Sequence, residues 1–155
     1  MNSGHAQRPG VLKREAFVPG WTKGIQRLDT VGSTQEEAKI LAEGGAPEGT
    51  TVMAEAQTGG RGRMGRKWHS PHGKGIWMSL VLRPNLPLAL TPQLTLLAGV
   101  AVCTAIREVT GVPAGIKWPN DLLAGGRKIC GICWNPRFGK AGCIIVSPVS
   151  ALLPI

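Results

Sequence analysis

Residues 59–68 are the segment of this sequence with the clearest capacity for chemistry. Four glycines, four cations and Met64 fill the nine consecutive positions before Trp68, in the order GGRGRMGRK. Glycines let backbone N–H groups converge on an anion because no Cβ stands in the way, and arginine adds bidentate contacts to phosphate or carboxylate. The segment predicts a site for a negatively charged ligand. A solvated loop and a Gly-Arg tether for single-stranded nucleic acid are the alternatives.

Known nucleotide fingerprints do not describe this segment. It lacks the G-x-x-x-x-G-K-[ST] pattern, and no G-x-G-x-x-G opens a helix. A bound nucleotide must therefore be held in another way. The short, non-repeating run also argues against a nucleic-acid tether.

A second polar cluster occupies residues 117–121, with the sequence KWPND. It places a cation, an amide and a carboxylate around a proline turn, and residues 126–128 (GRK) follow shortly afterwards. Surface solvation is the simpler interpretation of Lys117 or Lys128 taken singly. Their tryptophan, proline, glycine and apolar neighbours favour a site.

Hydrophobic patterning indicates the elements that must position these segments. We expect strands over residues 25–30, 50–57, 76–82 and 116–118. Ser33 followed by Glu36 forms an S-x-x-E capping box, which predicts a helix to about Glu43 that stops at the Gly44-Gly45 pair. Ser33 is then a plain cap or a cap beside a ligand, and the plain cap is favoured.

The remaining elements surround the two polar clusters. Residues 58–75 form a long polar loop, whose length favours a functional role. A helix from Thr91-Pro92 to Val109, stopped by Gly111, is apolar on most faces and suits burial against a sheet. Residues 121–132 predict a hairpin around the turn at 124–127. Together these elements predict an α/β (α+β) domain in which helices flank a mixed β-sheet.

Composition limits the classes of protein that fit. The chain has 155 residues, 43% of them hydrophobic, and a formal net charge of +9, which fits one domain that meets a polyanion, a phosphate-bearing substrate or an acidic partner. The N-terminus has no apolar segment typical of a secretory signal, and the longest apolar run, residues 94–106, is short of the roughly 20 residues that cross a membrane. We expect a cytoplasmic protein with no membrane partner.

The four cysteines, Cys103, Cys130, Cys133 and Cys143, are expected to be thiols. Cys130 and Cys133 have the spacing of a redox motif but fall in a strand-like run, where no helix N-terminus stabilises a thiolate. A zinc site would need four ligands. Redox or zinc chemistry is the minor alternative.

Four segments taken in order resemble one known family. They are Ser33-Thr34-Gln35, GRGRMGRKW at 60–68, KWPND at 117–121 and GRKICGI at 126–132. Their order, spacing and content resemble the catalytic domain of biotin protein ligase, over about residues 25–142. The resemblance implies the biotin/lipoate ligase fold, which is similar to that of class II aminoacyl-tRNA synthetases.

The family resemblance also implies a reaction and its participants. Biotin and MgATP would form biotinyl-5'-AMP and pyrophosphate, and a lysine of a carboxylase's biotin carboxyl carrier domain would then take the biotinyl group. ATP and Mg²⁺ are co-substrates, and biotin is the substrate. A homodimer is possible, and nucleic acid is not an expected partner.

Roles are carried over position by position. Residues that match the family's biotin contacts are Ser33, Thr34, Gln35, Gln57, Arg61, Gly62, Arg63, Lys128 and Gly131. Residues that match its ATP or adenylate contacts are Arg61, Arg63, Arg66, Trp68, Lys117 and Asn120. The resemblance implies catalytic roles for Lys128, Arg63 and Asp121, and it assigns no protein metal ligand.

The sequence departs from the family pattern near its end. We expect a loose lead-in over residues 1–23, an incomplete catalytic domain over 24–142 and a family-unlike tail over 143–155, after a chain interrupted or frameshifted near residue 142. The hairpin at 121–132 would then lack its neighbouring strands. The alternatives to an active ligase are an inactive biotin-binding fragment, lipoate or octanoyl transfer on the same fold, and a basic nucleic-acid-binding module.

Overall fold

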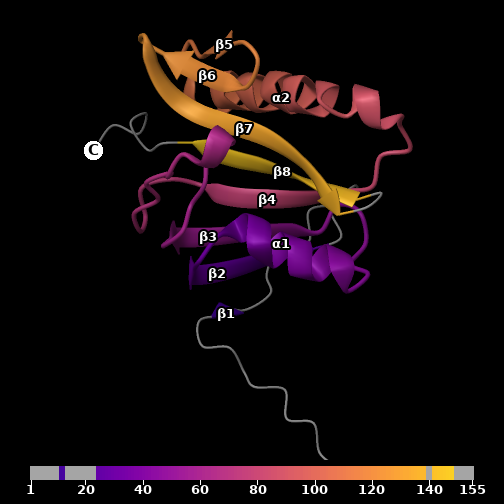
Figure 1. Ribbon diagram of the computed structural model, residues 1–155. Helices are drawn as coiled ribbons and strands as arrows, with labels where there is room; N and C mark the ends of the chain where they lie inside the picture. The colour runs from indigo at the N-terminus through magenta and orange to yellow at the C-terminus, as the bar shows by residue number, and fades with distance from the viewer. Residues whose placement is uncertain (1–10, 13–23, 139–140, 149–155) are drawn as a thin grey trace, which may run out of the picture.

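One eight-stranded mixed sheet forms the body of the molecule (Figure 1). The computed structural model describes residues 11–12, 24–138 and 141–148. The spatial order of the strands is β1-β2-β3-β4-β8-β7-β6-β5. The strands are β1 (Val11–Leu12), β2 (Ile25–Val31), β3 (Thr51–Gln57), β4 (Trp77–Leu82), β5 (Gly115–Lys117), β6 (Asp121–Ala124), β7 (Arg127–Phe138) and β8 (Ala141–Pro148).

The sheet is mixed because one connection differs from the rest. β2 and β3 run parallel, joined by a helix, whereas the other neighbouring strands are antiparallel. Parallel neighbours need such a crossover, and antiparallel ones can be joined by short turns. The predicted α/β class with a mixed sheet is confirmed.

Helix α1 (Thr34–Glu43) begins at the predicted cap. Ser33 is extended, and its Oγ accepts a hydrogen bond from the backbone N–H of Gln35 at 3.3 Å. The helix ends at Gly44, as the glycine pair predicts. The side chain of Glu36 differs from a capping box, since it pairs with Arg61 at 3.1 Å.

Helix α2 (Gln93–Thr110) ends at Gly111, whose φ of 70° is the left-handed conformation that glycine adopts easily. The helix packs on the sheet as expected, but with one face only. Within the helix only Gly99 and Cys103 are buried, and Leu97 and Val100 are exposed. The apolar helical segment, Leu88–Thr110, has the length and hydropathy of a membrane span, yet here one of its faces packs on the sheet.

The two helices pack on opposite faces of the sheet, as the alternation along β4 shows. Val81 packs in a cluster with Ala38 and Ala42 of α1. Its neighbours Leu80 and Leu82 belong to a second cluster, which includes Cys103 of α2. Because successive side chains of a strand point to opposite faces, α1 and α2 cover different sides (Figure 1).

The predicted hairpin at residues 121–132 is present and longer than expected. Its turn, Gly125-Gly126, has φ values of 54° and 75°, which suit glycine at both central positions. The second arm extends to Phe138 and is followed by β8, which pairs with both β4 and β7.

The chain beyond Gly142 therefore contributes to the sheet through Pro148, and the expectation that the hairpin lacks neighbouring strands is wrong. The physical reason is the β-branched run Ile144-Ile145-Val146, which favours an extended strand. Residues 149–155 of the predicted tail lie outside the described residues. Within the predicted lead-in, Val11 and Leu12 pair with Leu28 and Arg27 of β2, and the rest is likewise outside them.

Candidate functional site

Gln57 connects the start of α1 to the glycine-rich loop. Its Oε1 accepts hydrogen bonds from the backbone N and the hydroxyl of Thr34, at 2.9 and 3.2 Å. Its Nε2 donates to Ser70 Oγ at 2.9 Å. The Thr34 hydroxyl also lies 2.9 Å from Ser79 Oγ in the interior. Four polar side chains thus fix the floor beneath the loop.

The loop doubles back on itself above that floor. Trp68 N donates to Gly60 O at 2.9 Å, and Gly62 N donates to Arg66 O at 2.7 Å. A Cβ at Gly60 would lie 2.7 Å from Trp68 O and 2.8 Å from Ser70 Oγ, closer than real side chains come. Glycine is therefore required at position 60 for the loop to close over the Gln57 floor.

The second polar cluster meets the hairpin through a chain of charged contacts. Lys128 Nζ lies 2.8 Å from Asp121 Oδ1, which also accepts a hydrogen bond from Asn120 Nδ2 at 2.9 Å. Asn120 Oδ1 accepts a hydrogen bond from Arg63 Nη1 at 2.8 Å. All three catalytic positions expected from the resemblance are therefore within one connected group.

Trp68 and Gly131 complete the surroundings of the lysine. Lys128 Nζ lies 4.8 Å from the centre of the Trp68 ring, a cation–π contact. A Cβ added at Gly131 would lie 3.3 Å from Lys128 Cε and 3.4 Å from Trp68 Cη2. The bare backbone at 131 leaves the room in which the ammonium group lies.

Three cavities border the charged group that Arg63, Asn120, Asp121 and Lys128 form. A small cavity of about 30 Å³ is bounded by Arg61, Arg63, Trp68, Lys128 and Gly131 among others. A cavity of about 660 Å³ opens on the α1 side, and one of about 550 Å³ opens beside the start of α2. Arg63 and Cys133 line all three, so the charged group of Arg63, Asn120, Asp121 and Lys128 lies between the two larger cavities.

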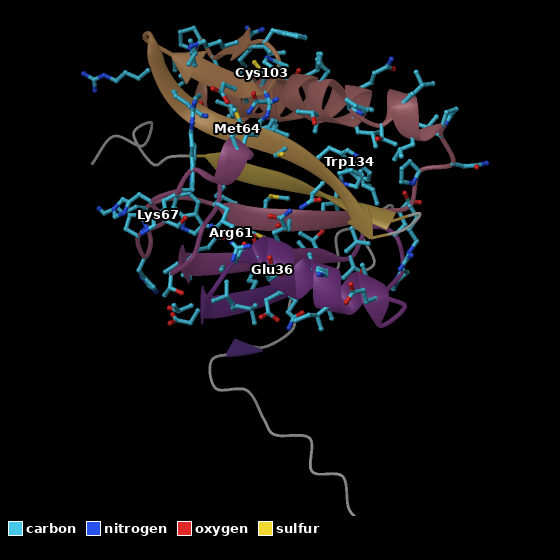
Figure 2. All side chains as sticks on the ribbon, in the orientation of Figure 1. Glu36, Arg61, Met64, Lys67, Cys103 and Trp134 are labelled. Atoms are coloured by element: carbon cyan, nitrogen blue, oxygen red, sulfur yellow. The ribbon has the colours of Figure 1, made fainter. Side chains whose placement is uncertain are left out.

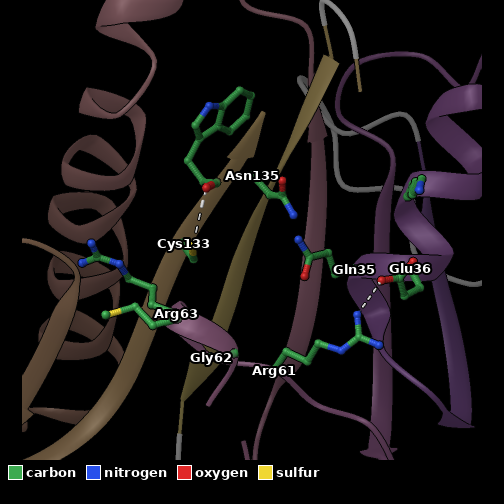
Figure 3. Close-up of a pocket in the computed structure, with 11 residues that line it drawn as sticks. Gln35, Glu36, Arg61, Gly62, Arg63, Cys133 and Asn135 are labelled. Atoms are coloured by element: carbon green, nitrogen blue, oxygen red, sulfur yellow. Dashed lines mark hydrogen bonds and ion pairs between the residues drawn. The ribbon is translucent and has the colours of Figure 1, made fainter. Parts of the chain in front are cut away.

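The cavity of about 660 Å³ is lined by polar and positively charged side chains, among them Arg61 and Arg63 (Figure 3). Arg61 Nη1 lies 3.1 Å from Glu36 Oε1 across it, and Gln35 and Asn135 face the same space from α1 and β7. Glu36 and Arg61 are about half exposed, so this ion pair contributes little to stability. Its effect is to place the guanidinium on the cavity wall.

Cys133 is the thiol at the junction of the cavities. Burial raises the pKa of this thiol, and the positive charge of Arg63 opposes that effect. The neutral thiol is therefore favoured at neutral pH, as expected for a strand position. Among the described residues, no three His, Cys, Asp or Glu side chains gather to hold a metal ion.

Several positions expected from the sequence lie away from the group. Arg66 and Lys117 are exposed and line none of these three cavities. Ser33 is buried and caps α1, while Thr34 is entirely buried against Gln57 and Ser79. In this structure Ser33 and Thr34 hold the start of α1 and the side chain of Gln57 in place. Their contacts to a ligand stay predictions.

Sequence reasoning missed residues that complete the site. Ser70 and Ser79 hold Gln57 and Thr34, Glu36 pairs with Arg61, and Cys133 and Asn135 form the β7 wall. The alternation of side chains along a strand could have predicted the β7 wall of the cavity, because Gly131, Cys133 and Asn135 fall on the same face as one another. The serines gave no comparable signal.

This arrangement of cations suits a reaction between two negatively charged reactants. Arg61, Arg63 and Lys128 converge from a loop and a strand on one small space, with Asp121 as the carboxylate that orients the lysine. Preorganised cations of this kind stabilise charge that develops in a transition state. Among the residues that line the small cavity, none is an activated nucleophile, because the thiol of Cys133 is favoured in its neutral form.

A family model, curated relatives and solved structures all relate this chain to the same group of ligases. The model of the biotin/lipoate A/B protein ligase family matches residues 29–148. The chain is 59% identical over 104 residues to the bifunctional ligase/repressor BirA of Bacillus subtilis, covering 67% of this chain and 32% of that protein. It is 39% identical over 121 residues to the biotin–[acetyl-CoA-carboxylase] ligase of Mycobacterium tuberculosis, covering 73% and 46%.

Two solved structures are also similar. The biotin protein ligase of Aquifex aeolicus in complex with biotin and ATP has a TM-score of 0.73 and 34% identity, covering 85% of this chain and 55% of that one. The Leishmania major enzyme in complex with biotinyl-5-AMP has a TM-score of 0.73 and 29% identity, covering 84% and 59%. The chain thus spans about a third to a half of the two curated relatives.

Proposed function

The chain belongs to the biotin/lipoate A/B protein ligase family, and on that premise we propose that it carries the adenylate-forming site of a biotin protein ligase. The observation that carries the proposal is the position of Lys128. Its ammonium group is held by Asp121 at 2.8 Å, lies over Trp68 and lines the small cavity with Arg61 and Arg63.

In the proposed first step, a carboxylate oxygen of biotin attacks the α-phosphorus of ATP. The acyl–phosphate bond forms, the bond to the β-phosphate oxygen breaks, and pyrophosphate leaves with the electron pair. Both reactants are anionic, so repulsion and the charge of the transition state dominate the barrier. Lys128, Arg61 and Arg63 would neutralise that charge from fixed positions, and Mg²⁺ would arrive with the ATP phosphates.

In the proposed second step, the amine of an acceptor lysine attacks the acyl carbon of biotinyl-5'-AMP. The amide bond forms, AMP leaves with the bonding electrons, and the amine gives up its proton to solvent or to a nearby carboxylate. The acceptor is a carboxylase's biotin carboxyl carrier domain. We also propose a cytoplasmic protein, with the homodimer as a possible assembly.

The similar proteins support biotin as the acid, because the relative from Mycobacterium tuberculosis is a biotin–[acetyl-CoA-carboxylase] ligase and both similar solved structures are of biotin protein ligases. Gln57, Thr34, Ser70 and Ser79 hydrogen-bond to one another beside the loop and line none of the three cavities. Contacts from this polar set to the two N–H groups and the C=O of biotin's ureido ring therefore stay a prediction.

The test is product analysis with the purified chain. We expect biotin, ATP and Mg²⁺ to give biotinyl-5'-AMP and pyrophosphate, detected by mass spectrometry and a phosphate assay. Lipoate and octanoate in parallel reactions should give none. Biotin binding without product, seen by calorimetry, would favour the inactive fragment, and an acyl-AMP from lipoate alone would favour lipoate transfer.

A further inference from the structure

Two large apolar side chains stand exposed at the walls of the two larger cavities, Met64 at the cavity on the α1 side and Trp118 at the cavity beside α2. Met64 is 89% exposed on the loop, and Trp118 is 76% exposed on the turn that precedes β6. A hydrogen bond 2.8 Å long, from Arg63 Nη1 to Asn120 Oδ1, joins the residue before Met64 to the residue two positions after Trp118. Exposed residues of this type at one place are typical of a binding surface.

The backbone at Met64 has an unfavourable conformation, and the side chain it carries is exposed. Its φ is 59°, a left-handed conformation that only a few per cent of non-glycine residues adopt, and Gly65 follows at 74°. Figure 2 shows Met64 on the loop in front of β7 and Lys67 at the outer side of the same loop. A position that favours glycine thus carries a long apolar side chain that touches little of its own protein.

The charge of the same loop is one-sided. Residues 58–75 include five Lys or Arg and no Asp or Glu. Arg61 is paired with Glu36, but Lys67 is exposed and makes no ion pair in the part of the chain that the structure describes. An acidic partner surface is the natural complement to cations that their own protein leaves uncompensated.

We propose that Met64, Lys67 and Trp118 form a docking lip for an acidic protein surface, that of the acceptor domain. The inference rests on the proposed function, because an acceptor amine that reaches the small cavity must bring its domain against Arg63 and Asn120, which both line that cavity. Met64 and Trp118 supply the apolar contacts, and Lys67 steers the acidic surface. Apolar contacts on both sides favour a folded protein over a nucleic acid.

The variants Trp118→Ala, Met64→Ala and Lys67→Glu test the lip without touching the proposed reaction chemistry. Binding of an unmodified carboxylase acceptor domain is measured by calorimetry with the full chain, and no turnover is needed. We expect Trp118→Ala to weaken binding at least about fivefold, because exposed aromatic anchors carry much of an interface's energy. Lys67→Glu should weaken it about threefold or more at low salt and less at high salt.

Arg27→Glu on β2 is the matched charge control, since Arg27 is an exposed cation that lines none of the three cavities. It should leave acceptor binding unchanged. The same variants are assayed for biotin-dependent pyrophosphate release, which needs no acceptor and should stay within about twofold of the unmodified chain. A wild-type chain that binds the acceptor but forms no adenylate would defeat the proposed function and not the lip.

Unchanged acceptor binding in all three variants would overturn the lip, and so would an equal loss of binding in Trp118→Ala and Arg27→Glu. Loss of adenylate formation in Trp118→Ala would also overturn it, because the ring would then lie inside the reaction site. A single-stranded oligonucleotide that binds more tightly than the acceptor domain and loses affinity in Lys67→Glu would assign the surface to nucleic acid.

Discussion

Lys128 Nζ lies 2.8 Å from Asp121 Oδ1, across the two strands of one hairpin. The same oxygen accepts a hydrogen bond from Asn120, which in turn accepts one from Arg63. One carboxylate therefore fixes the lysine directly and the loop arginine indirectly. An incoming carboxylate or phosphate would compete with Asp121 for this lysine, so ligand binding and loop position should be coupled.

Gly131→Ala should displace the lysine. The new methyl group would lie 3.3–3.4 Å from Lys128 Cε and Nζ and from the edge of Trp68, tighter than most real contacts. We expect biotin-dependent pyrophosphate release to fall at least about tenfold while the protein stays folded, because a small misplacement costs much in catalysis. Gly99→Ala is the control, since a Cβ there meets nothing within 4 Å and alanine favours the helix. Equal activities of the two variants would show that the space at 131 is not used.

Arg63→Gly should let the intermediate escape. The substitution removes the hydrogen bond to Asn120 that closes the loop over the small cavity, yet leaves Lys128 in place. Biotinyl-5'-AMP should then form and appear free in solution, where it can be measured by chromatography after rapid filtration. Retention equal to that of the unmodified chain would mean that another contact keeps the intermediate.

Residues 58–75 should become resistant to trypsin when biotin and ATP are both present. Glycines make the loop costly to order, and contacts from its arginines to an anion would offset that cost. Cleavage after Arg61, Arg63, Arg66 and Lys67 is followed by mass spectrometry with and without ligands. Equal cleavage rates in both conditions would refute ordering by the ligand.

Alkylation of Cys133 should be slow at pH 8. Burial raises its pKa, so less thiolate is present than for a free cysteine, and the rate should climb only at higher pH. Arg63→Gly should slow it further by removing a charge that lowers the pKa. The same shift makes stability fall as pH rises above the ordinary thiol pKa, because the unfolded thiol ionises first. Peptide mapping after iodoacetamide treatment reports this site, and a rate at pH 8 like that of free cysteine would contradict the burial argument.

Much of the scaffold follows from local sequence, and part of the site does not. The Gly125-Gly126 turn, the Ser33 cap and the Gly111 stop each depend on one residue's conformational preference, and each is where the sequence predicts. Glu36 has the capping-box spacing but pairs instead with Arg61, 25 positions away. No local pattern reports a contact that the folded loop creates.

A β-bulge is the clearest case of information that spacing alone does not give. Lys128 and Gly131 are an odd number of residues apart, so a regular strand would put them on opposite faces. The register between β6 and β7 shifts between Leu122 and Leu123, and the lysine side chain comes within contact of position 131. A bulge re-aims side chains in this way, and only the paired strands reveal it.

The position of Lys128 is the centre of this account, and its replacement is the most direct test. Biotin-dependent exchange of labelled pyrophosphate into ATP is measured for Lys128→Ala and for Lys74→Ala, an exposed lysine on the same loop as the arginines. We predict a loss of at least about 100-fold for Lys128→Ala, with ATP binding changed less than about threefold, since its charge acts on the transition state. Lys74→Ala should exchange normally. Undiminished exchange by Lys128→Ala, in a chain whose unmodified form is active, would contradict the central claim.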